Sequence, residues 1–315
     1  MTDLIIIGGG VAACSAGIFA GRRGLKTIVV ARDIGGQTAS TSEIDNYPGV
    51  GRIEGPQLID IFYNQARDVG CEFIDGSVQS VNENGESFEI ATHGDRFTAS
   101  GIICAFGKTP KNLGIVGEEK YEGRGINYCN VHLATRYKDK VVAVVGGGNS
   151  ALEIVWQLSG IARHIYLIHR SEQFRAEQIL LERLESLANV EKKLNTVLVD
   201  LHGSEKLEAI SISTLGTHDV EQLELDELFV AIGFESRTAF MDKVVQCDTT
   251  GKIIIDERCR TSKEGIFAAG DCTTVPYQQI VISAGEGAKA ALSAYQYLAK
   301  KQGKRSLQVD WGFHA

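Results

Sequence analysis

The order of hydrophobic and polar residues indicates that the chain contains one strand–helix–strand unit twice. In the first copy, the apolar run DLIII (3–7) leads through three glycines into VAACSAGIFAG, which has helical periodicity, and then into KTIVVA. In the second, VVAVV (141–145) leads through three more glycines into NSALEIVWQLSG and then HIYLIH. A buried strand that enters a helix through a short glycine turn is typical of βαβ units in parallel sheets. The pattern therefore predicts two α/β units.

Two alternating stretches and one further strand complete the pattern. SFEIATHGDRFTASGIICA predicts short antiparallel strands that lead into a buried strand at 101–105, and a similar meander runs from LEAISISTLG to LELDELFVAIG. GIFAAGDC (265–272) predicts a strand that ends in Gly-Asp, before a long helix rich in small residues. We expect an α/β fold with two Rossmann-like dinucleotide-binding domains of three layers (ββα), the second inserted in the first. The expected domains are 1–110 with 238–315, and 111–237.

Composition narrows the setting in which the chain works. The apolar N-terminal run has no basic segment before it and is soon interrupted by glycines, so we expect neither a signal peptide nor a membrane span. Seven cysteines form no close pair and no metal-type spacing, which favours a reducing, cytoplasmic location and no metal site. The net charge of −8 argues against nucleic acid or anionic lipid as a main partner.

One basic cluster follows the last predicted helix. It either caps the negative end of the helix dipole or docks an acidic protein, and the sequence leaves both readings open. Its members are Lys300, Lys301, Lys304 and Arg305.

The two glycine turns carry the candidate chemistry. Gly8-x-Gly10-x-x-Ala13 allows a tight turn at a strand end, close approach of a pyrophosphate, and close packing of the new helix, whose N-terminus then faces the anion. Gly146-x-Gly148-x-x-Ala151 repeats this arrangement. One such match is weak evidence, but two in the correct strand–helix context predict two dinucleotide sites.

The end of the second strand in each unit bears on which nucleotide binds, because an acid there suits a ribose 2′-hydroxyl and an arginine suits a 2′-phosphate. In the second unit this place reads HRSEQFR, with Arg170 and Arg175 and no carboxylate at the strand end. The sequence therefore favours NADPH over NADH. The alternative is a solvated surface pair balanced by Glu172 and Glu177.

Motifs along nearly the whole chain resemble those of the low-molecular-weight thioredoxin reductases, which are class II pyridine nucleotide-disulfide oxidoreductases. These motifs are GGGVAA, GGQTASTSEIDNYPG (35–49), GRGINYC (123–129), GGGNSALE (146–153), HRSEQFRAE (169–177) and FAAGDC…QQIVISAGEGAKAA (267–291). The resemblance implies FAD in the first domain, NADPH in the inserted one, and a homodimer.

The resemblance also implies the residues of each site. For the FAD pyrophosphate they are Gly8, Gly10 and Ala13; for the flavin side, Gly36, Gln37 and Asn46; for the ribityl chain, Asp271; for the pyrimidine edge, Gln279 and Ile280; and, in the same site, Gly107. For the second dinucleotide they are Gly146, Gly148, Asn149, Ser150, Ala151, Arg170 and Arg175.

The chain departs from this family where the family carries Cys-x-x-Cys followed by aspartate. Here Cys129 takes the first place, His132 the second and Leu133 that of the acid. Imidazole cannot accept electrons into a disulfide, and leucine cannot supply a proton to a leaving thiolate. Cys129 is then either a small buried hydrophobe or a lone redox thiol, with a distant Cys272 as its conceivable partner, and His132 either a structural histidine or a proton donor to reduced flavin.

Other departures agree with a changed role. Ser171 and Gln278 replace family arginines, which weakens the preference for NADPH. The tail carries Trp311, Phe313 and His314 and resembles that of ferredoxin–NADP reductases built on this fold, where such groups cover one flavin face. The alternative is a tail that packs on the other protomer of a dimer.

Three functions remain open on this sequence. The first is an FAD enzyme that passes electrons from NAD(P)H to an acceptor other than an internal dithiol, such as ferredoxin, flavodoxin, a quinone or a small oxidant. The second is a thioredoxin-disulfide reductase that works through Cys129 with an external or distant thiol. The third is a non-catalytic flavoprotein or redox sensor. The second nucleotide site holds NADPH, NADH, a second flavin or nothing.

Overall fold

The computed structural model describes residues 2–41, 43–128, 134–217, 219–236, 238–241 and 243–304. The chain divides into two compact units, Met1–Thr109 with Glu235–Ala315, and Pro110–Phe234. It passes between them twice, through β7 (Thr109–Pro110) and β16 (Phe234–Glu235), which pair as a short two-stranded sheet.

A seven-stranded mixed sheet forms the centre of the first unit. In spatial order its strands are β3 (Glu72–Asp75), β2 (Thr27–Ala31), β1 (Thr2–Ile7), β6 (Arg96–Cys104), β5 (Ser87–Thr92) and β4 (Val78–Asn84), with β17 (Ile266–Ala268) beside β6. The first four strands and β17 are parallel, and β6, β5 and β4 form an antiparallel meander. The expected meander is therefore present, and its last strand joins the parallel part of the sheet.

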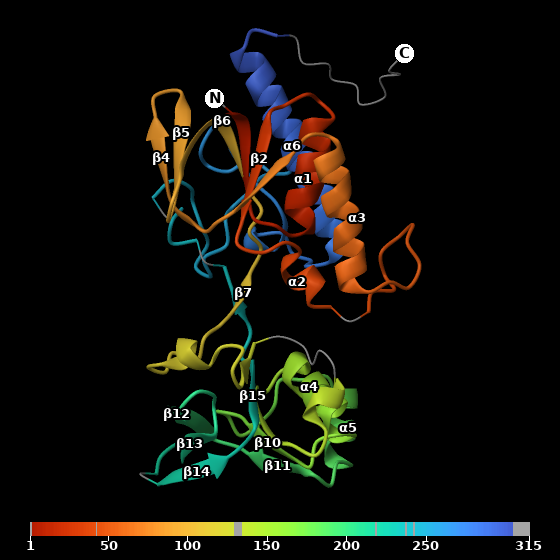
Figure 1. Ribbon diagram of the computed structural model, residues 1–315, viewed down its shortest axis with the longest axis vertical. Helices are drawn as coiled ribbons and strands as arrows, with labels where there is room; N and C mark the ends of the chain where they lie inside the picture. The colour runs from red at the N-terminus through yellow and green to blue at the C-terminus, as the bar shows by residue number, and fades with distance from the viewer. Residues whose placement is uncertain are drawn as a thin grey trace. The chain divides into compact units, whose positions relative to one another are not determined.

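Helices cover one face of this sheet, as Figure 1 shows. They are α1 (Val11–Gly21), α3 (Gly55–Asp68) and α6 (Ile280–Lys301), while α2 (Gly36–Ala39) and the 3-10 turn η3 (Gly270–Cys272) lie in connecting segments. The strands are apolar on both faces because both are covered: Leu4 and Ile6 pack toward α1 and α6, whereas Ile5 and Ile7 pack on the other side.

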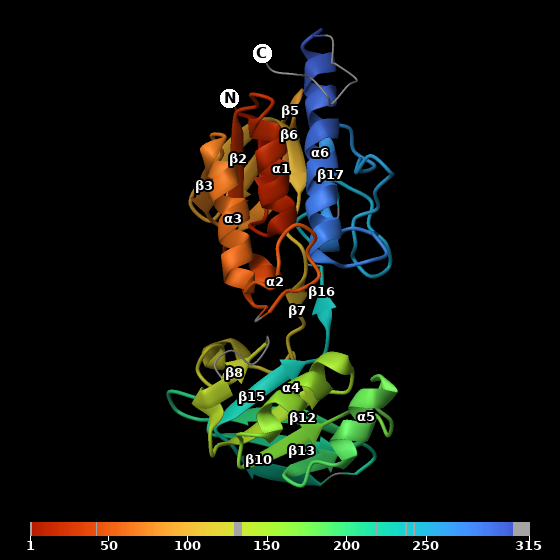
Figure 2. The same ribbon diagram turned by 90° about the vertical axis from the view of Figure 1, so that its right-hand side faces the viewer.

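Helices α1 and α6 come from opposite ends of the chain and lie side by side in both views (Figures 1 and 2). Their contact needs a glycine, because a β-carbon at Gly287 would lie 2.1 Å from the Ala12 carbonyl oxygen. The Ser15 hydroxyl donates a hydrogen bond of 2.7 Å to the Ala284 carbonyl and ties the two helices together. The N-terminal βα unit is thus completed by the last helix.

The second unit has three layers, which agrees with the expected ββα arrangement. Its central parallel sheet has the order β11 (Val190–Lys193), β10 (His164–Ile168), β9 (Val141–Gly146), β15 (Glu227–Ala231) and β8 (Ile126–Asn127). One face packs on α4 (Asn149–Ser159) and α5 (Gln178–Glu185), and the other on the antiparallel sheet β12 (Thr196–His202), β13 (Ala209–Thr214) and β14 (Val220–Glu224). The 3-10 turns η1 (Glu118–Tyr121) and η2 (Ala134–Tyr137) complete this unit.

No helix within the described residues is both long and apolar enough to cross a bilayer. The structure confirms the predicted α/β class, and each unit contains a strand–glycine–helix junction.

Candidate functional site

A cleft of about 480 Å³ lies in the first unit at the carboxyl ends of β1, β2, β6 and β17. Loops that follow parallel strands meet at this edge, where α/β sheets bind their ligands. Segments far apart in sequence line the cleft: the turn at Gly8–Ala12, the residues after β6 from Ala105 to Thr109, and Asp271 after β17.

The first glycine turn fits a pyrophosphate. Gly8 has φ +120°, and a β-carbon there would lie 2.3 Å from the Ala105 carbonyl oxygen, so only glycine allows β1 to turn this close to β6. Gly10 faces open space instead, since the nearest atom to a β-carbon would be the Gly35 carbonyl oxygen at 3.9 Å. No described side chain caps helix α1 at Gly10, so the N–H groups of its first turn remain available to an anion.

Asp271 also lines the cleft and belongs to η3. Its carboxylate accepts a hydrogen bond of 3.3 Å from the Ser283 hydroxyl. Burial raises the pKa of Asp271, and the charge of Lys108 and the bond from Ser283 oppose that rise. A partly buried carboxylate with so few donors is costly unless a ligand supplies hydroxyl or amide groups. The cleft therefore offers an acceptor as well as an anion site.

Two hydrogen bonds bring distant predicted residues together. The Asn46 amide nitrogen donates to the Gln279 side-chain oxygen at 3.2 Å, across 233 positions of sequence. The Gln37 amide nitrogen donates to the Lys108 carbonyl oxygen at 3.3 Å. Eight of the ten residues assigned to this site line the cleft: Gly8, Gly10, Gly36, Gln37, Gly107, Asp271, Gln279 and Ile280.

The other two assigned residues lie elsewhere. Asn46 is not among the residues that line the cleft, but its amide donates to Gln279, which is. Ala13 is fully buried in the core beneath α1, where its small side chain permits close packing of the helix on the strands.

Among the polar residues of this cleft that sequence reasoning missed are Asp33, Lys108 and Ser283. Asp33 follows the second strand of the first unit, where an acid suits a ribose hydroxyl, so the rule applied to the second unit would have identified it. Lys108 directly follows a glycine at a strand end, which is a weaker signal. Ser283 has no sequence signal, because its role depends on the contact of α6 with Asp271.

The second glycine turn repeats the geometry of the first. Gly146 has φ +153°, and a β-carbon there would lie 2.3 Å from the Ala231 carbonyl oxygen and 2.9 Å from the Ala151 β-carbon. Ala151 is fully buried. A β-carbon at Gly148 would meet no atom within 4 Å, and helix α4 begins there without a cap from any described side chain. This turn also leaves room for an anion at a helix N-terminus.

Asn149 and Glu177 close one side of this turn. The Asn149 amide donates to the Glu177 carboxylate at 2.9 Å, and the Asn149 oxygen accepts from the Glu177 backbone N–H at 2.8 Å. Ser150 is exposed at the next position. The Arg175 backbone N–H donates to the Gly147 carbonyl, which holds the Arg175 backbone beside the glycine turn.

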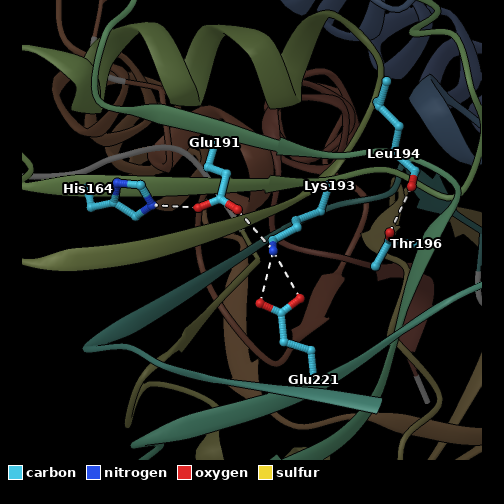
Figure 3. Close-up of polar contacts among 6 residues, drawn as sticks. All are labelled: His164, Glu191, Lys193, Leu194, Thr196 and Glu221. Carbon is cyan, nitrogen blue, oxygen red and sulfur yellow. Dashed lines mark hydrogen bonds and ion pairs between the residues drawn. The ribbon is translucent and has the colours of Figure 1, made fainter. Parts of the chain in front are cut away.

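Lys193, at the end of β11, is paired with two carboxylates of the same unit (Figure 3). Its ammonium group lies 2.9 Å from the carboxylates of both Glu191 and Glu221, and Glu191 also pairs with His164 at 3.3 Å. Burial lowers the pKa of Lys193, but the bonds to Glu221 and Glu191 outweigh it and raise this pKa. Near the end of β10, Arg170 and Arg175 are exposed, and we find no ion pair for them within the described part of the chain.

Five predicted site residues lie outside the described residues. They are Cys129, His132, Trp311, Phe313 and His314.

Comparison with known proteins gives a consistent picture. A family model described as "Pyridine nucleotide-disulphide oxidoreductase" matches residues 2–294. An alkyl hydroperoxide reductase component of Escherichia coli is 36% identical over 95% of this chain, which spans 58% of that protein. The NADH dehydrogenase of Bacillus subtilis is 33% identical, with 59% of its length covered. The chain thus spans somewhat over half the length of these relatives.

Other relatives match over their full length. The thioredoxin reductase of Helicobacter pylori is 35% identical over 95% of this chain and 99% of its own. The crystal structure of Lactococcus lactis thioredoxin reductase has a TM-score of 0.80 at 31% identity, and covers 95% of this chain and 100% of that one. For the T. acidophilum thioredoxin reductase the TM-score is 0.76 at 29% identity, with 94% and 98% covered.

Proposed function

Because the chain belongs to the pyridine nucleotide-disulphide oxidoreductase family, we propose that it moves electrons from NAD(P)H to an acceptor other than a dithiol of its own. Family membership makes the chain an oxidoreductase and implies FAD and NAD(P)H as cofactors. One observation carries the proposal about the acceptor: Cys129 is the only cysteine between residues 110 and 234. The inserted unit therefore has no second thiol with which to form a disulfide.

Five of the six cysteines of the first unit offer no substitute. These five are buried, and burial raises the pKa of each thiol: to about 12 for Cys14, Cys259 and Cys272, to about 11 for Cys71, and well above the usual value for Cys104. Thiols with such pKa values hold almost no thiolate at neutral pH, and thiolate is the form that exchanges with disulfides. Cys272 is fully buried, with its sulfur 3.4 Å from the Ala269 carbonyl oxygen, which argues against its pairing with Cys129.

In this proposal the first cleft holds FAD. The N–H groups at the start of α1 bind the pyrophosphate, Gly8 and Gly10 allow it to approach, and Asp271 accepts hydrogen bonds from the ribityl hydroxyls. Gln37, Asn46 and Gln279 orient the flavin end through their amides. When bound, FAD accepts the two electrons of a hydride and can release them to a one- or two-electron acceptor.

The second glycine turn holds the nicotinamide nucleotide. The start of α4 at Gly148, Asn149 and Ser150 binds its pyrophosphate, and Arg170 and Arg175 bind a 2′-phosphate, which favours NADPH. Trp311, Phe313 and His314 remain predicted to cover a flavin face, and a homodimer remains predicted from the family resemblance.

The relatives support a shared region that takes electrons from the nicotinamide nucleotide, and they do not support one shared acceptor. Proteins whose names describe an alkyl hydroperoxide reductase, an NADH dehydrogenase and a thioredoxin reductase all match the same region of this chain. Their names differ in what is reduced or oxidised, so the acceptor is set outside the features that they have in common. The full-length match to thioredoxin reductases favours disulfide reduction through Cys129 as the second candidate.

The two candidates differ in what Cys129→Ser does. We expect rapid reduction of bound FAD by NADPH or NADH under anaerobic conditions, turnover with a quinone or ferricyanide, and unchanged turnover in Cys129→Ser. Cys247→Ser, which alters a half-buried thiol of the first unit, is the matched control. Efficient thioredoxin or insulin disulfide reduction that Cys129→Ser abolishes and Cys247→Ser leaves intact would refute the proposal. A flavin that NAD(P)H cannot reduce would indicate a non-catalytic flavoprotein.

A further inference from the structure

Lys108 is a cationic residue of the first cleft. It follows Gly107, whose φ of +62° turns the chain after β6 toward the cleft. Lys108 is half-buried and lines the cleft together with Asp271. The fold thus places a lysine in the lining of the predicted cofactor cleft.

This ammonium group lacks a direct counter-ion, since we find no salt bridge to Lys108 in the part of the chain that the structure describes. Burial lowers its pKa and the charge of Lys252 lowers it further, whereas Asp271 and Asp248 act in the opposite direction from longer range. A partly desolvated cation without a paired carboxylate gains stability from any anionic group that enters the cleft. Lys252 does not line the cleft, and Arg32, which does, lies 3.7 Å from the Asp33 carboxylate, so Lys108 is the lining cation placed to meet such a group.

The contacts of Lys108 indicate which end of the cofactor it meets. Its carbonyl oxygen accepts the hydrogen bond from the Gln37 side chain, and Gln37 belongs to the flavin end of the proposed site. The helix N-terminus at Gly10 already supplies donors for the pyrophosphate. The Lys108 backbone therefore lies at the flavin end of the proposed site.

We propose that Lys108 binds the reduced, more negatively charged form of FAD more tightly than the oxidised form and so raises the reduction potential of the bound cofactor. This inference rests on the proposed function, in which FAD occupies the cleft. The two electrons and the proton come from NAD(P)H as hydride, and Lys108 forms no covalent bond in this step.

The size of the effect follows from linkage. A cation stabilises two redox forms unequally when their charges differ, and the attraction is stronger where water is partly excluded. The ratio of the two affinities sets the midpoint potential, and a tenfold change in that ratio corresponds to about 30 mV for a two-electron couple. The effect is therefore measurable without any assay of turnover.

The test compares Lys108→Met, Lys108→Arg and Lys252→Met as purified holoproteins. Lys108→Met removes the charge but keeps much of the side-chain volume, Lys108→Arg keeps the charge, and Lys252→Met removes a nearby cation that lies outside the cleft lining. Midpoint potentials are measured by spectroelectrochemistry, and affinities for oxidised FAD by titration of the apoproteins. We expect a lower potential in Lys108→Met with nearly unchanged affinity for oxidised FAD, restoration in Lys108→Arg, and a smaller shift in Lys252→Met.

A wild-type potential in Lys108→Met would overturn the inference while leaving the proposed function intact. If this variant also bound oxidised FAD more weakly, Lys108 would hold both redox forms equally, as a phosphate ligand does. If Lys108→Met fails to fold by circular dichroism, Lys108→Gln provides the same comparison. A wild-type protein that binds no FAD would instead overturn the proposed function, and this inference with it.

Discussion

Two of the three glycines of the first turn, Gly8 and Gly10, have different roles, one in folding and the other in cofactor binding. Gly8 is needed for the path of the backbone: its φ is +120°, and an added β-carbon would lie 2.3 Å from the Ala105 carbonyl oxygen and 2.6 Å from its carbon. Gly10 has φ −80° and an open surrounding, so alanine fits its conformation. We therefore expect Gly8→Ala to damage the fold and Gly10→Ala to damage the cofactor site.

The magnitudes follow from these contacts. At Gly8, a side chain held in a disfavoured backbone region costs about 1–3 kcal/mol, and overpacking against the backbone of the adjoining strand adds about 1–3 kcal/mol. The sum is a loss of about 2–6 kcal/mol, a large part of the stability of a typical domain. At Gly10, a poorer helix cap costs about 1 kcal/mol, and the stiffer unfolded chain offsets about 0.4–1 kcal/mol of it. The β-carbon then occupies space that a pyrophosphate needs, which we estimate to weaken FAD binding by about 1–3 kcal/mol, or about 5- to 150-fold.

Urea unfolding of the apoproteins and fluorescence titration with FAD measure the two effects separately. Gly8→Ala should shift the unfolding midpoint well below that of the wild type, and Gly10→Ala should leave it nearly in place while the dissociation constant for FAD rises. Wild-type affinity in Gly10→Ala would refute the assignment of this turn to the pyrophosphate. A Gly8→Ala apoprotein as stable as the wild type would refute the steric reasoning.

Three further predictions use the same logic. In the second turn, Gly146→Ala should destabilise the inserted unit, whereas Gly148→Ala should keep its stability and lose affinity for NADPH, as calorimetric titration would show; equal behaviour of the two variants would contradict the parallel between the turns. The pKa of Asp271 is raised above 3.8, so its contribution to apoprotein stability is complete below that pH and is lost as pH rises through the raised pKa. We therefore expect the Asp271→Asn apoprotein to be more stable than the wild type at pH 7 and to bind FAD more weakly. A thiol titration of the native protein at pH 8 should leave five cysteines unreacted until denaturant is added, and their early reaction would contradict the raised pKa values; these are Cys14, Cys71, Cys104, Cys259 and Cys272.

The sequence was sufficient to predict the α/β class and the two glycine turns because these depend on local order. A continuous apolar strand must be buried on both faces, and glycine is the residue that allows the turn at its end. The strands at 3–7 and 141–145 and the long helix after 279 therefore appear in the structure where the pattern expects them, as β1, β9 and α6.

The rest depends on contacts that only folding creates. The bond between Asn46 and Gln279 joins positions 233 residues apart, and no periodicity encodes it. The environment of Lys108 is equally non-local, because burial and the charges of Lys252, Asp271 and Asp248, all far along the sequence, shift its pKa. Charge and hydropathy patterns describe the residue types along the chain. The hydrogen bond of Asn46 and the environment of Lys108 depend instead on residues that become neighbours only in the folded protein.

The interrupted first unit has a consequence for synthesis on the ribosome. Strand β6 needs β17 as a neighbour, and α1 needs α6 against its Ala12 face, yet both partners follow the whole inserted unit in the chain. All strands of the inserted unit are synthesised before β17 and α6, which the first unit needs to complete its fold. Domains that emerge first ordinarily fold first, whereas here the inserted unit is able to reach its native state during translation before the unit that encloses it.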